Sequence, residues 1–108
     1  MTVNEAIGLL GLETLNLSDG DRPIEGGYTG DLLSWVMGRA QSGDAWVTIM
    51  TNINVVAVAQ LTDVACVIIA EGAEIGGDVI ARAASQGINL LRGGKTAWEM
   101  ISALSDKI

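Results

Sequence analysis

Hydrophobic and polar residues alternate along the chain with two different periods, which predict helices and strands in turn. Apolar residues three and four positions apart predict a helix over residues 3–10. Thr2 and Glu5 form a capping-box pattern before this helix, and Gly11 follows its end, where a left-handed residue commonly closes a helix. The apolar–polar alternation over residues 12–17 then predicts a short strand.

The middle of the chain begins with residues that favour turns. Residues 18–23 predict a loop, and the glycine-dense residues 24–30 extend it to a helix whose apolar face spans residues 32–40. A β-prone run follows at residues 45–50. Asn54 is then expected to cap a short apolar helix over residues 55–61, although valine-rich runs also suit strands.

The last third of the chain starts with residues 65–70, which are apolar throughout, as expected for a central parallel strand that is covered on both faces. A helix from Asp78 ends at Gly87, a short strand follows at residues 88–91, and Thr96 and Glu99 repeat the capping box before a last helix. This alternation predicts one α/β domain over residues 1–108, with a mostly parallel sheet of about four to five strands and helices on both faces.

Composition and charge narrow the classes of partner. The 108 residues are 49% hydrophobic and carry a net charge of −7, and the six basic residues are scattered singly. Nucleic-acid binding requires clustered cations, and an anionic membrane surface repels an acidic chain, so we expect neither partner. No apolar run reaches the length of a membrane span, no signal peptide is apparent, and the single cysteine, Cys66, has no internal partner, so we expect a cytoplasmic protein.

Most catalytic and metal chemistry is excluded by residue type. The chain has no histidine and one cysteine, which removes Ser-His and Cys-His pairs and thiolate zinc sites. Asp19, Asp21 and Glu25 could in principle hold Mg²⁺ or Ca²⁺, but their spacing fits no EF-hand and we interpret them as solvated loop carboxylates. We therefore predict no enzymatic activity, no metal and no cofactor.

The string Gly94-Lys95-Thr96 resembles the end of a phosphate-binding P-loop. The full pattern needs a glycine five positions before Gly94, where the chain has Asn89 inside a predicted strand. The alternative explanation is that the glycines turn the chain and Thr96 caps the last helix. We favour this alternative, and it predicts that the protein neither hydrolyses ATP nor phosphorylates a protein.

Two segments that precede predicted helices remain as a candidate ligand site. The starts of helices present unpaired N–H groups, and open α/β sheets bind ligands at the carboxyl ends of their strands. The predicted ligand-binding residues are Gly26, Gly27, Tyr28, Thr29, Gly30, Asp31, Thr51, Asn52 and Asn54. The competing explanation is structural, with Thr29 or Asp31 capping a helix and the glycines allowing close packing. If a ligand binds, Asp31 favours a neutral or metal-complexed one over a bare polyphosphate.

The same segments carry a resemblance to a known family. Residues 26–37 resemble the GGY-x-x-DLLS-x-VM stretch of small DRTGG-domain proteins, and residues 46–49 with 54–59 resemble the family's W-x-T and N-x-x-AVA segments. The Asp-Arg-Thr-Gly-Gly string itself is absent, and Asp21-Arg22, separated from Gly26-Gly27, is its nearest match. The resemblance implies a fold like the N-terminal domain of HPr kinase/phosphorylase, without the kinase domain.

The resemblance also implies an accessory role. DRTGG domains occur as non-catalytic parts of some CBS-domain pyrophosphatases and phosphotransacetylases, and stand-alone members accompany hydrogenase-type redox systems in anaerobic bacteria. Three hypotheses follow: a regulatory module that self-associates and senses a small, nucleotide-like ligand; a protein-binding subunit or adaptor of a redox system; and, less favoured, a small carboxylate-dependent enzyme. The three tryptophans and four methionines of a chain without phenylalanine further predict a homodimer or larger homo-oligomer.

Overall fold

The computed structural model describes residues 1–108 and contains a five-stranded sheet with the strand order β1-β5-β4-β3-β2. The strands from β2 to β5 are parallel, and β1 pairs with β5 in the antiparallel direction. This arrangement confirms the predicted α/β class and the mostly parallel sheet. The elements in chain order are α1 (Val3–Leu10), β1 (Glu13–Asn16), β2 (Gly26–Thr29), α2 (Leu33–Arg39), β3 (Asp44–Thr48), α3 (Asn54–Thr62), β4 (Cys66–Ile69), α4 (Gly77–Gln86), β5 (Leu90–Arg92) and α5 (Ala97–Ser105).

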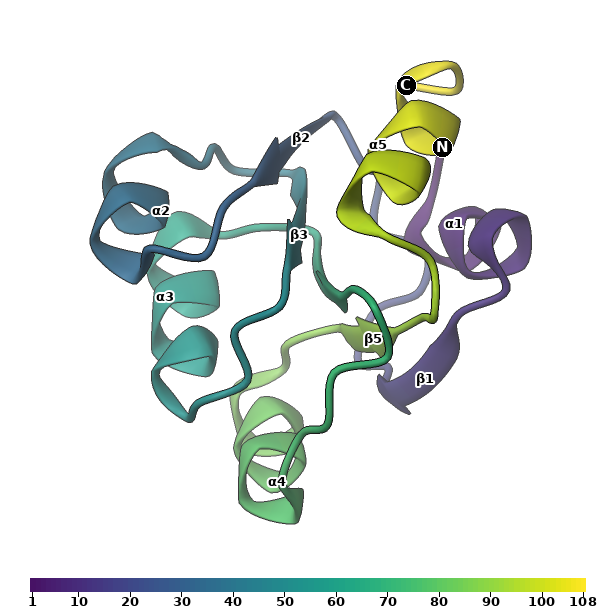
Figure 1. The fold of residues 1–108 in the computed structure, drawn as a ribbon. Coiled ribbons are helices and arrows are strands. Elements are labelled where there is room, and N and C mark those ends of the chain that lie inside the picture. The colour runs from purple at the N-terminus through teal and green to yellow at the C-terminus, as the bar shows by residue number, and fades with distance from the viewer.

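Helices cover both faces of the sheet, as Figure 1 shows, with α1 and α5 on one side and α2, α3 and α4 on the other. The central strand β4 supplies both cores, because successive side chains of a strand point to opposite faces. Cys66 and Ile68 lie in the core under α1 and α5, and Val67 and Ile69 lie in the core under the other three helices. Burial raises the pKa of the Cys66 thiol to about 12, so this cysteine is a packing residue.

The ends of the helices follow the predicted signals. Thr2 and Thr96 both form complete capping boxes: each hydroxyl accepts a hydrogen bond from the amide of a glutamate three residues on, at 3.2 Å, and that glutamate accepts one from the threonine amide. Gly11 and Gly87 close α1 and α4 in the left-handed region, with φ values of 62° and 70°. The local sequence therefore sets these boundaries.

These caps predict how stability depends on pH. The amides of Thr2 and Thr96 hold the pKa values of Glu5 and Glu99 below their ordinary 4.5. A carboxylate whose pKa is lowered in the folded state stabilises the fold fully at a pH above its ordinary pKa. This stabilisation is lost as the pH falls through the lowered pKa. At pH values under about 4.5 we expect the melting temperature, measured by circular dichroism, to decrease as the pH is lowered. The decrease should be less steep in a Glu5→Gln/Glu99→Gln variant.

The control for this pH series is Glu74→Gln, a change at an exposed loop carboxylate that has no capping role. Its melting profile should keep the slope of the parent protein. An unchanged slope in the double variant would show that the capping carboxylates do not contribute to the acid transition.

Two sequence-based predictions about elements are wrong. Residues 26–29 form the strand β2 and not a loop, because their backbone pairs with β3 in the register Gly26↔Asp44 to Thr29↔Val47. Asn54 is not an N-cap, since the cap position belongs to Ile53 and Asn54 is the first helical residue. The side chain of Asn52 instead accepts a hydrogen bond from the Asn54 amide at 2.9 Å, which supports the start of α3 from outside it. The choice of a helix for the valine-rich segment is confirmed.

The string that resembles a P-loop has a structural role. Asn89 is 4% exposed, and its side-chain oxygen accepts hydrogen bonds from the amides of Ser18 at 2.8 Å and Asp19 at 2.9 Å. Its side-chain nitrogen donates to the carbonyls of Asp19 at 2.8 Å and Ala65 at 3.0 Å. Asn89 thus fastens the 18–23 loop to the sheet, and Thr96 caps α5 as the structural explanation predicted.

Two further findings concern metal binding and membrane-spanning helices. No three His, Cys, Asp or Glu side chains of the chain gather closely enough to hold a metal ion. None of the helices combines the length and apolar character that crossing a membrane requires.

Candidate ligand-binding site

The predicted site residues lie around β2, which is one edge of the sheet, and around the start of α3. Because β2 and β3 are parallel, their carboxyl ends are neighbours, with Thr29 beside Val47 in the register. The structure therefore places the end of β2 and the turn after β3 at the same end of the sheet. The nine predicted residues nevertheless differ in burial and in their hydrogen-bond partners.

Asp31 joins the ends of the two strands. Its carboxylate accepts hydrogen bonds from the Thr48 hydroxyl at 2.8 Å and from the Ile49 amide at 2.9 Å. The Thr48 oxygen in turn accepts a hydrogen bond from the amide of Met50 at 3.1 Å. One carboxylate oxygen of Asp31 is therefore committed to holding the β2–α2 and β3–α3 connections together.

Tyr28 lies on the face of the sheet that α2, α3 and α4 cover, and it packs half-buried against that core. Its ring also lies close to Gly30, where a Cβ atom would be 3.1 Å from the ring. The carbonyl of Gly30 accepts a hydrogen bond from the indole N–H of Trp46 at 3.0 Å. Tyr28 and Gly30 consequently shape the end of β2 from the side opposite to Gly27 and Thr29.

Thr51, Asn52 and Asn54 form the turn into α3. Asn52 and Asn54 are exposed, and Thr51 is half-buried. The Asn54 side chain and the amide nitrogen of the Asn52 side chain make no hydrogen bond within the chain, so they are free to bind a polar group.

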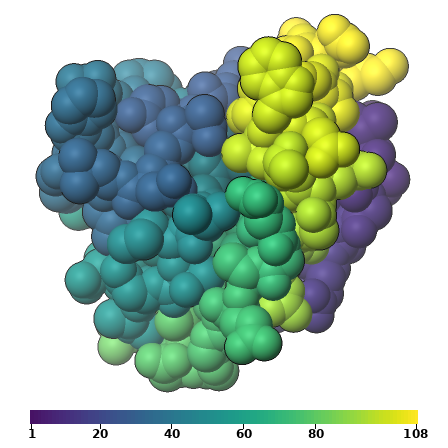
Figure 2. Space-filling model, in the orientation of Figure 1, coloured from purple at the N-terminus to yellow at the C-terminus, as the bar shows by residue number.

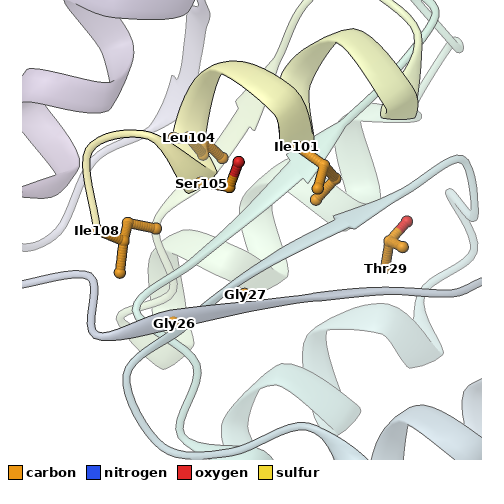
Figure 3. Close-up of a pocket in the computed structure, with 7 residues that line it drawn as sticks. All are labelled: Gly26, Gly27, Thr29, Ile101, Leu104, Ser105 and Ile108. Carbon is orange, nitrogen blue, oxygen red and sulfur yellow. The ribbon is translucent and has the colours of Figure 1, made fainter.

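A cavity of about 350 Å³ lies between β2 and α5 and is the main concave feature near the predicted site. Figure 3 shows side chains of α5 directed toward the strand, whose two glycines leave its surface bare. Figure 2 shows the β2–α2 segment in blue and α5 in yellow-green as separate ridges with a recess between them. The lining residues are Gly26, Gly27, Thr29, Ile101, Leu104, Ser105 and Ile108.

The cavity exists because Gly27 leaves this face of β2 without a side chain beside Thr29. A Cβ atom at Gly27 would meet only the carbonyl oxygen of Ala45, at an ordinary 3.5 Å, so a larger residue would fit there and would fill the space. The Thr29 hydroxyl donates to the carbonyl of Val47 at 3.1 Å and keeps its lone pairs for an acceptor role. Since β2 is an edge strand, its outer backbone groups have no strand to pair with.

The cavity joins an apolar wall to a few polar groups, which is the usual make-up of a small-molecule site. Ile101 and Leu104 supply the wall, while the hydroxyls of Thr29 and Ser105 and the strand backbone supply the polar groups. Carboxylates stand at both ends of β2, Asp31 after it and the buried Asp44 beside Gly26, so the surroundings disfavour a bare polyphosphate.

The sequence prediction missed the whole α5 side of the cavity. Ile101 and Leu104 lie at positions i and i+3, so Ile101 extends the apolar face of α5 beyond its buried residues Met100 and Leu104, and Ile108 follows three residues after the helix ends at Ser105. The spacing of these apolar residues can be recognised in the sequence. The strand that faces them, however, is more than 70 positions earlier in the chain, so the sequence alone does not predict the cavity.

The sequence matches no family model and no curated protein. A solved structure of the CBS and DRTGG domains in the regulatory region of Clostridium perfringens pyrophosphatase, in complex with the activator diadenosine tetraphosphate, is similar in fold with a TM-score of 0.75. The similarity covers 95% of this chain and 45% of that one at 12% sequence identity, so this chain spans less than half of that protein region. The chain thus shares its α/β fold with a part of that regulatory region.

Proposed function

We propose that this chain is a non-catalytic regulatory domain that binds a small ligand in the cavity between β2 and α5 and that associates with itself. The cavity of about 350 Å³ with its glycine floor carries the proposal, because such a bare strand opposite an apolar helix leaves space that the fold does not need. The absence of histidine and the structural use of Asn89 and Thr96 support a role without catalysis.

The cavity chemistry favours a nucleotide-like ligand that presents a flat ring. A ring would lie on the peptide planes of Gly26 and Gly27 and against Ile101 and Leu104, with its polar edge toward the strand backbone. The similar fold was solved with an adenine dinucleotide, which supports this class of ligand. The phosphates would extend toward the free amides of the turn before α3, away from the cavity itself.

Replacing Gly27 with valine is expected to abolish binding of the probes AMP, ADP and diadenosine tetraphosphate while the protein stays folded. The new side chain enters open space in the cavity and meets nothing closer than 3.5 Å. Backbone amide shifts of ¹⁵N-labelled protein during titration would locate the parent site at residues 26–31 and 101–108, and circular dichroism would confirm that the variant folds.

The matched control is Gly94→Val, which places the same side chain in open space after β5, at the string that resembles a P-loop. This variant should bind each probe as the parent does. Shifts centred on Gly94 and Thr96 in the parent, or probe binding that survives Gly27→Val, would contradict the proposed site.

A second function is favoured by exposed apolar side chains of α2 and of the residue before it. Leu32 and Trp35 lie three positions apart and are 60% and 54% exposed, and Met37, on another side of the helix, is 48% exposed. Exposed apolar side chains of this size suit a protein partner, which would make the chain an accessory subunit or adaptor of a redox system. If none of the three probes shifts any amide, the adaptor function becomes the better proposal. The narrower resemblance to the HPr kinase N-terminal domain remains a prediction.

A further inference from the structure

The outer side of α5 is a separate feature from the cavity on its inner side. Trp98, on the outer side, is 81% exposed, the largest exposed fraction among the large hydrophobic side chains. It stands beside a shallow groove of about 460 Å³ between α5 and α1. The groove is lined by Leu9, Leu10, Lys95, Trp98, Glu99, Ser102, Ala103 and Asp106. Trp98 and the 41% exposed Leu9 give this groove an apolar lining that a protein partner could cover.

The groove-lining residues of α5 and its two ends form one stripe, defined here as Lys95, Trp98, Glu99, Ser102, Ala103 and Asp106. The spacings of 3, 1, 3, 1 and 3 positions place them on one side of the helix. This series of spacings is the same when it is counted from either end of the helix. In an antiparallel pair of these helices, each residue of the stripe would therefore lie opposite another residue of the stripe.

We infer that the α5 stripe is the surface through which two copies of this chain associate, with their α5 helices antiparallel about a twofold axis. Lys95 then lies opposite the partner's Asp106, and Trp98 lies opposite the partner's Ala103, where a small residue leaves room for the indole. The inference rests on the self-association in the proposed function and names its surface.

Charge favours a second copy over an unrelated partner. The stripe carries its cation at one end and Asp106 at the other, so antiparallel pairing matches opposite charges twice, although the whole chain is strongly acidic. Glu99, the remaining charge, lies opposite the partner's Ser102, and hydrogen bonds from the amide and the hydroxyl of Thr96, both at 3.1 Å, hold its carboxylate toward the start of α5. Antiparallel helices also place opposite ends of their dipoles together. An isologous interface of this kind closes as a dimer.

The first test is sedimentation velocity over a concentration series, with Trp98→Glu compared with Trp35→Glu. The parent should approach twice the monomer mass of 11.2 kDa. Trp98→Glu should raise the dimer dissociation constant by at least about tenfold, because a central interface tryptophan is lost and a charge is buried. Trp35→Glu puts the same charge on the exposed α2 surface and should leave the constant unchanged.

The second test uses charge reversal, which does not depend on the tryptophan. Lys95→Glu and Asp106→Lys should each weaken the dimer several-fold, because each places like charges opposite one another. An equal mixture of the two variants should form a heterodimer of parental affinity, since both pairs are then opposite in charge. Mixing that restores nothing would overturn the antiparallel register.

Two outcomes separate the inference from the function on which it rests. A parent dimer that dissociates with Trp35→Glu and not with Trp98→Glu would overturn the α5 surface and leave self-association standing. A parent that stays monomeric over the whole series would overturn both, whereas ligand binding is judged independently by the Gly27→Val titration.

Discussion

Replacing Asn89 with alanine is expected to lower the free energy of unfolding by about 4 kcal/mol, since four hydrogen bonds are lost and each contributes about 1 kcal/mol. The substitution removes the hydrogen-bond partner of the Ser18 and Asp19 amides and of the Ala65 carbonyl. The smaller alanine side chain also leaves part of this partly buried space unfilled. Urea unfolding followed by far-ultraviolet circular dichroism would measure the change.

The control is Asn54→Ala. Asn54 is exposed at the start of α3, and its side chain makes no hydrogen bond within the chain, so the change should stay within about 0.5 kcal/mol. Equal effects of the two substitutions would contradict the anchoring role of Asn89.

Glycine at position 89 provides a functional form of the same test, because it completes the P-loop string in the sequence. We expect the Asn89→Gly variant to lose stability and to gain no binding of MgATP. Residues 90–92 form β5, whose register places Leu91 beside Ile68, and the amide of Gly93, which follows the strand, donates to the carbonyl of Ile69. These amides are therefore not available to surround a phosphate.

The predictions from sequence that succeeded depend on local signals. The capping boxes at Thr2 and Thr96 act over three residues, and the apolar run of β4 indicates a strand that is covered on both faces. Gly11 and Gly87 end their helices for the same local reason, because both adopt positive φ values. The class of the fold follows from the order of these elements.

The predictions that failed depend on distant partners. Two glycines at the start of β2 disfavour a strand locally, and only pairing with β3 makes this segment a strand. The sequence also does not show that Asp31 and Thr29 bond to β3 and the residue after it, and their role in binding a ligand stays a prediction. The cavity could not be seen at all, because its other wall, α5, meets β2 through the tertiary fold.

The position of α5 connects the two proposals. Its inner side, with Ile101 and Leu104, lines the cavity, while its outer side carries the dimer stripe. A ligand that moves or stiffens this helix would alter the affinity between copies, and dimer formation would then alter the affinity for ligand by the same factor.

The three tryptophans, whose number in the sequence predicted self-association, separate by role. Trp46 has no exposed surface, lies in the core under α2, α3 and α4, and donates its indole N–H to the carbonyl of Gly30 at 3.0 Å. Trp35 is half exposed and stacks with the guanidinium of Arg39, 3.8 Å from the centre of its ring. Trp46 is therefore the tryptophan whose loss should destabilise the protein most.

Replacing Trp46 with alanine is expected to lower the free energy of unfolding by about 4 kcal/mol, because the buried indole no longer packs against the core and a cavity remains in its place. This decrease is a large part of the total stability of about 5–15 kcal/mol typical of a domain. Trp35→Ala should change stability by less than about 1 kcal/mol, because solvent already surrounds much of that ring. Circular dichroism during urea unfolding reports both variants without relying on tryptophan fluorescence. If the Trp46→Ala protein were as stable as the Trp35→Ala protein, packing of Trp46 in this core would not be what stabilises the β2–β3 end of the sheet.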